Sequence, residues 1–95
     1  MNSLNVLTVI AHLRDQLRNE CLPRANDEFE RNAVRSIDLK LGLIVSQIEQ
    51  PKLVDRDKRF GEITRMVEEI DPVVIPVEIG RQLIAIDGYY RALES

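Results

Sequence analysis

The feature that most constrains this fold is an apolar-periodic stretch over residues 27–50, DEFERNAVRSIDLKLGLIVSQIEQ. At a helical step of about 100° per residue, seven of its apolar side chains fall on one broad stripe. They are Ala33, Val34, Ile37, Leu41, Ile44, Val45 and Ile48. A stripe this wide is typical of a helix that packs against a protein core. The pattern therefore predicts a long helix around which the rest of the chain is organised.

Three large apolar residues of the same stretch lie outside that stripe: Phe29, Leu39 and Leu43. If the helix packed against the protein on one side alone, its other sides would need no large apolar residues. These three residues therefore indicate that a second side of the helix is also covered. The helix predicted over residues 55–70 is one candidate cover, and a second copy of the chain is the other. We expect a homodimer with these three residues near the contact and with Tyr89 at its rim.

Three further helices are expected. The first spans residues 3–21, and Pro23 should end it because proline disfavours the α conformation at Leu22. Asn26 or Asp27 can cap the long helix that follows. The third helix runs over residues 55–70, or from Phe60 onward because Gly61 weakens its first half. The fourth begins at Pro76, and its apolar residues are spaced 4, 3, 4 and 3: Ile79, Leu83, Ile86, Tyr90 and Leu93.

These helices predict an all-α fold, an antiparallel helical bundle of about four helices that forms a single domain over residues 1–95. The alternative is an α+β fold with a short strand at residues 73–79. It rests on the β-branched run from Val73 to Val77, which favours extended backbone.

Composition and charge exclude several classes of function. Apolar residues make up 44% of the chain and charged residues 31%, with a net charge of −3 and a pI near 5.1. Nucleic-acid-binding domains usually carry a basic patch and a pI above about 9, so we do not expect nucleic acid as a partner. The basic cluster at residues 52–59 is diluted by Asp55 and Asp57, and is interpreted as a solvated helix start.

The residues that usually carry catalysis or bind metals are scarce. The single His12 falls on the polar face of the first helix and the single Cys21 on its apolar face, so helical geometry points them apart. One histidine and one cysteine do not make a zinc site, and residues 55–66 fail the pattern of a calcium loop. The four glycines form no phosphate-binding motif. We therefore predict a protein that is not an enzyme and that has no cofactor and no metal.

The N-terminal residues carry no basic region before an apolar run, so they are expected to be mature sequence rather than a signal peptide. No apolar run approaches the roughly 18 residues of a membrane span. A lone cysteine fits a reducing compartment. The expected location is the cytoplasm, without a membrane partner.

One resemblance covers the region from His12 to Val67. Its matching pieces are Leu13-Arg14, Leu22-Pro23, Phe29, Ala33-Val34 and Leu43-Ile44-Val45. This order resembles a family of small helical domains of unknown function that are attached to, or encoded beside, aminoglycoside-phosphotransferase-like proteins. Asp38 and Lys40 interrupt the pattern. The resemblance carries no catalytic residue and implies an accessory helical module.

The leading hypothesis for function is a non-enzymatic interaction protein, either a homo-oligomer or a small accessory subunit of a larger complex. The alternative is a small regulator of bacterial or phage type that binds and inhibits a protein or a nucleic acid. A third class, an enzyme built on carboxylates in the bundle core, stays open.

Overall fold

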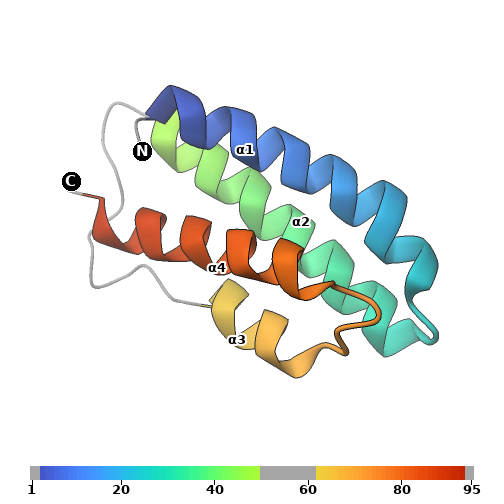
Figure 1. Ribbon diagram of the computed structural model, residues 1–95. Helices are drawn as coiled ribbons and strands as arrows, with labels where there is room; N and C mark the ends of the chain where they lie inside the picture. The colour runs from blue at the N-terminus through green and yellow to red at the C-terminus, as the bar shows by residue number, and fades with distance from the viewer. Residues whose placement is uncertain (1–2, 50–61, 94–95) are drawn as a thin grey trace.

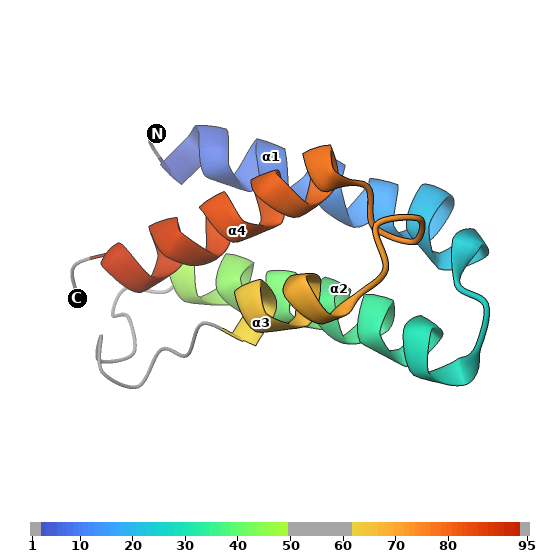
Figure 2. The same cartoon turned by 60° about the horizontal axis from the view of Figure 1, so that its bottom comes forward.

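The computed structural model describes residues 3–49 and 62–93, and all of its regular structure is helical. The elements are α1 (Ser3–Gln16), α2 (Glu28–Glu49), α3 (Glu62–Glu69) and α4 (Val77–Ala92). They alternate in direction (Figure 1), and the two views place α1 and α2, α2 and α3, α3 and α4, and α4 and α1 side by side (Figure 2). The prediction of an all-α antiparallel bundle of four helices is confirmed.

The core lies inside this ring and receives side chains from every helix. From α2 it buries four of the seven residues of the predicted stripe, Val34, Ile37, Leu41 and Ile44, while Ala33, Val45 and Ile48 are partly buried against it. The buried hydrophobic residues of the other elements are Val6, Ile10, Leu13, Leu17, Cys21, Ile63, Ile70, Val74, Ile75, Ile79, Leu83 and Ile86. None of the described helices has both the length and the apolar character that crossing a membrane requires.

The first helix ends differently from the prediction based on Pro23. After Gln16 the helix widens into a π turn, Leu17–Cys21, and then tightens into a 3-10 turn, Leu22–Arg24. Leu22 keeps α-helical torsions (φ −57°, ψ −42°), and the backbone becomes extended only at Ala25. Pro23 therefore does not end the helix at Leu22. It sits in the first residues of the 3-10 turn, where its missing N–H is tolerated.

The start of α2 shows why this helix begins where it does. The Asp27 carboxylate accepts a hydrogen bond from the Glu30 N–H (2.8 Å), and the Glu30 side chain accepts one from the Asn26 N–H (3.0 Å). This is a reciprocal cap that satisfies backbone donors left free at a helix start. Of the two predicted caps, Asp27 is the one used.

The alternative strand at residues 73–79 is wrong. Residues 71–75 form a turn in which the Asp71 carbonyl accepts hydrogen bonds from the N–H groups of Val74 and Ile75, and the Asp71 carboxylate accepts one from Val73. This local bonding outweighs the β preference of the valines because an aspartate followed by proline favours a turn. Val74 and Ile75 are buried, and α4 follows directly after Pro76.

Helix α3 has eight residues and packs against α4, where a close approach at Gly80 and the hydrogen bonds of Asp87 stand out. A Cβ added at Gly80 would lie 3.1 Å from Cγ1 of Val67, so this glycine lets the two helices approach. The Asp87 side chain, 1% exposed, accepts hydrogen bonds from the Thr64 N–H (3.1 Å) and hydroxyl (2.6 Å). Thr64 lies in the first described turn of α3, so Asp87 caps the described start of this helix from α4. The predicted helix start at residues 55–60 lies outside the described residues.

Candidate functional site

The outer face of α2 carries three large apolar side chains that the bundle leaves in solvent. Phe29 is 68% exposed, Leu39 is 66% exposed and Leu43 is 65% exposed. From Phe29 to Leu43 the helix rises about 21 Å at about 1.5 Å per residue. Although α3 lies beside α2, it does not cover them. These are the three residues that the sequence pattern placed outside the core stripe, and for which it predicted a second covering partner.

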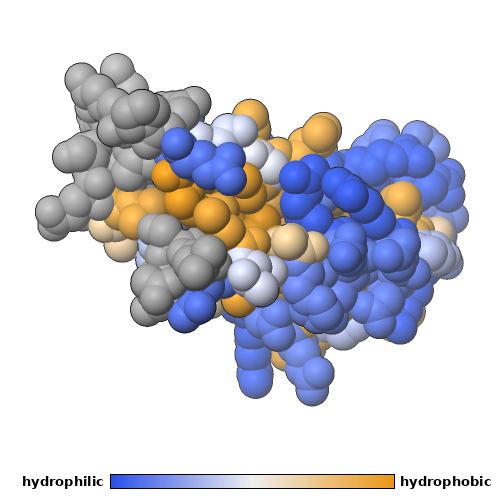
Figure 3. Space-filling model, turned by 90° about the horizontal axis from the view of Figure 1, so that it is seen from above, coloured by the Kyte–Doolittle hydropathy of each residue, from blue (hydrophilic) through white to orange (hydrophobic). Residues whose placement is uncertain are grey.

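The apolar surface is not spread evenly over the molecule. On the face seen in Figure 3, hydrophobic side chains gather toward the end where the termini lie, and hydrophilic side chains dominate the opposite end. Large exposed apolar residues also occur away from α2, at Val73, Val77 and Ile84. Single residues of this kind are ordinary on protein surfaces, whereas several on one helix face form a candidate interaction surface.

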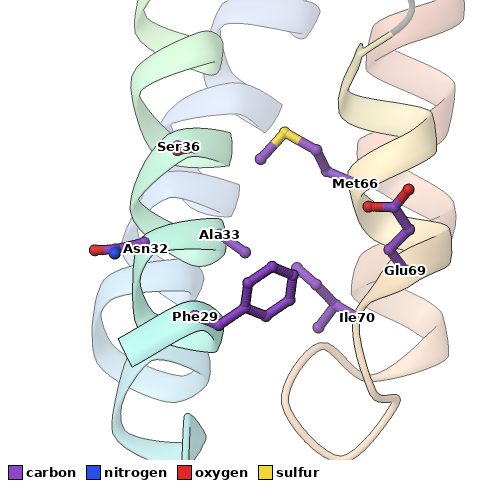
Figure 4. Close-up of a pocket in the computed structure, with 7 residues that line it drawn as sticks. All are labelled: Phe29, Asn32, Ala33, Ser36, Met66, Glu69 and Ile70. Carbon is purple, nitrogen blue, oxygen red and sulfur yellow. The ribbon is translucent and has the colours of Figure 1, made fainter. Parts of the chain in front are cut away.

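A groove of about 240 Å³ runs between the outer sides of α2 and α3. The Phe29 ring reaches from α2 toward Ile70, and Met66 reaches back from α3 (Figure 4). The groove is lined by Phe29, Asn32, Ala33, Ser36, Met66, Glu69 and Ile70. Sequence reasoning placed Phe29 and Met66 on their helices but did not find the groove, because it depends on how α3 lies against α2.

An ion pair holds the first turn of α3 against α2. The ammonium group of Lys40 contacts the carboxylate of Glu62, and both side chains are partly exposed. The hydrogen bond from Lys40, reinforced by its positive charge, lowers the pKa of Glu62 from its ordinary value. Glu69, two turns further along α3, is a charged residue that lines the groove.

Tyr89, the fourth predicted interface residue, is not part of this surface. It lies on α4 and packs half-buried against the core. The helical spacing places Tyr89 outside the seam of the fourth helix but does not distinguish partial burial from exposure. The structure therefore brings together Phe29, Leu39 and Leu43 on α2 and leaves Tyr89 on another helix.

The residues with the strongest chemistry are dispersed. His12 is exposed, whereas Cys21 is fully buried, and burial raises the pKa of its thiol. A buried, protonated thiol is a poor nucleophile and metal ligand. Within residues 3–49 and 62–93, no group of three or more histidine, cysteine, aspartate or glutamate side chains is placed to hold a metal ion.

A second charged cluster joins α1 to α2. The Arg14 Nε lies 2.7 Å from Oδ1 of Asp38, and the Arg18 Nε lies 3.1 Å from Oδ2 of the same carboxylate. Arg14 crosses α2 above Gly42, where an added Cβ would come within 3.1 Å of its guanidinium nitrogen. Gly42 thus accommodates a side chain of the neighbouring helix rather than a backbone. The adjoining cavity is only about 20 Å³, room for one water at most. We interpret the cluster as a structural clamp.

No protein-family model, curated protein or solved structure matches the chain. The resemblance to domains associated with aminoglycoside-phosphotransferase-like proteins stays a prediction. The outer face of α2 and the groove beside it are the features from which function is argued.

Proposed function

We propose that this chain is a non-enzymatic helical interaction protein that associates with a second copy of itself through the outer face of α2. The observation that carries the proposal is the exposure of Phe29, Leu39 and Leu43, about two-thirds of each side chain. Several large apolar side chains exposed on one helix face usually mark an interaction site. Closed two-fold dimers are the commonest way to cover such a surface in soluble oligomers.

The energetics favour burial of this face. Moving a leucine or phenylalanine side chain fully out of water contributes about 1.5–3 kcal/mol. A two-fold interface uses each of the three residues twice, once from each copy. The same gain is available in a complex with a different protein, which is the accessory-subunit form of the proposal.

The chemistry of the remaining residues supports binding rather than catalysis as the function. The exposed His12 and the buried Cys21 lie on different faces of the first helical segment, and the Asp38 carboxylate is engaged by two arginines. A nucleophile needs an adjacent base, and the histidine and the cysteine cannot serve each other in that role because they lie on different faces. A single cysteine fits a reducing compartment such as the cytoplasm.

Leu43→Asp tests the proposal. A charge buried without a partner in an apolar interface is costly, so the variant should be monomeric while keeping its helical circular dichroism. Val73→Asp is the matched control, because Val73 is 68% exposed but lies off α2, and it should leave the association unchanged. If both variants have the same mass as the parent protein, or if Leu43→Asp unfolds the chain, the proposal is wrong.

A further inference from the structure

The outer face of α2 has a symmetric arrangement about Ser36. Phe29 and Leu43 each lie seven residues from Ser36, which is two helical turns, and Asn32 and Lys40 each lie four residues from it. An antiparallel copy related by a two-fold axis at Ser36 therefore places Phe29 of each copy opposite Leu43 of the other, so that this contact occurs twice. The small Ser36 side chains meet at the axis, where two helices approach most closely.

The groove between α2 and α3 has a size and a lining that suit a side chain from another helix. Its volume of about 240 Å³ is below the ~300–1,000 Å³ of typical small-molecule sites. It is nevertheless larger than the ~150 Å³ cavity that accepts a benzene ring in other proteins. Phe29, Met66 and Ile70 make its walls apolar (Figure 4). In the antiparallel register, Leu43 of the second copy arrives beside Phe29, at the end of this groove.

Charge is complementary in the same register. Glu69 places a negative charge in the groove, and Asn32 lines the same groove. The residue placed opposite Asn32 is Lys40 of the second copy. Its ammonium group then reaches the Glu69 side of the groove, in addition to Glu62 of its own chain. A parallel arrangement would instead place Lys40 opposite Lys40, which is unfavourable.

We propose that a second copy of this chain docks antiparallel along α2 with the two-fold axis at Ser36, and that its Leu43 occupies the groove between α2 and α3. This inference rests on the proposed function and adds the register and the occupant of the groove. Because the interface is two-fold, each copy fills the groove of the other.

Disulfide cross-linking in a Cys21→Ser background tests the register. Ser36→Cys should give a covalent dimer under mild oxidation, because a disulfide requires Cβ atoms about 3.5–4.5 Å apart and the axis brings these two positions together. Asn32→Cys is the matched variant, on the same helix face one turn away. In the antiparallel register the two Asn32 positions, one from each copy, are eight residues apart along the helix axis, which is about 12 Å. Asn32→Cys should therefore cross-link at least tenfold more slowly.

The outcomes separate this inference from the proposed function. Selective cross-linking at position 36, lost on adding Leu43→Asp, is the expected result. Equal cross-linking at both positions, or a dimer by light scattering that links at neither, would overturn the register and the groove occupant while leaving self-association intact. A monomer by light scattering would remove both.

Discussion

The contact between Asp87 and Thr64 gives the sharpest stability prediction. Asp87 on α4 is 1% exposed, and its Oδ2 accepts both the backbone N–H and the hydroxyl of Thr64. Replacing it with alanine removes the acceptor of both Thr64 hydrogen bonds. Hydrogen bonds to charged groups contribute about 1.5–3 kcal/mol, and a carboxylate near a helix N-terminus contributes about 0.3–1 kcal/mol more. We expect Asp87→Ala to lower the free energy of unfolding by about 2–4 kcal/mol, a large share of the ~5–15 kcal/mol of a small domain.

Urea unfolding followed by circular dichroism measures this loss, and Thr64→Val is the matched variant. It removes the hydroxyl bond but keeps the N–H bond, so it should cost about 1 kcal/mol. Amide hydrogen exchange adds a local readout, because loss of the cap should speed exchange in α3 before α1 or α2. An Asp87→Ala protein that loses less than Thr64→Val, or whose α3 amides stay as protected as before, would refute this account of how α3 is held.

Two further predictions concern glycines and the cysteine. Gly88→Ala should stabilise α4 by about 0.5–1 kcal/mol because its Cβ meets nothing within 4 Å. Gly80→Ala should gain less than Gly88→Ala because its Cβ would press on Cγ1 of Val67, and thermal unfolding of the two variants checks this contrast. Burial raises the pKa of the Cys21 thiol, so its contribution to stability is complete below the unfolded pKa of about 8.5 and is lost as the pH rises through the folded pKa. The free energies of unfolding at pH 7 and pH 10 should differ less for Cys21→Ser than for the parent protein. An equal pH dependence in the two proteins would contradict a raised pKa of the Cys21 thiol.

Local periodicity explains how much of the fold the sequence predicts. The 3.6-residue repeat of a helix depends only on neighbouring residues, so the buried stripe of α2 and the seam of α4 follow directly from spacing. Leu83 and Ile86 are buried as expected. The same arithmetic identified Phe29 and Leu43 as lying outside the core stripe, and both are exposed.

Features that depend on how helices meet are not visible in such a pattern. The contact of Asp87 with Thr64 joins residues 23 positions apart, and nothing near either residue distinguishes it from an ordinary polar pair. The groove beside Phe29 likewise requires the position of α3. The alternative strand at residues 73–79 is wrong because Asp71 closes a turn through its own backbone and side chain, which outweighs the β preference of the valines that follow.

Self-association through the outer face of α2 is the central claim, and the mass of the protein in solution tests it most directly. Light scattering after size exclusion, over a dilution series at physiological salt, measures that mass without any modification of the chain. The account predicts a particle of twice the 10.9 kDa chain mass at high concentration, giving way to monomer only on dilution. A 10.9 kDa species at every concentration would contradict it.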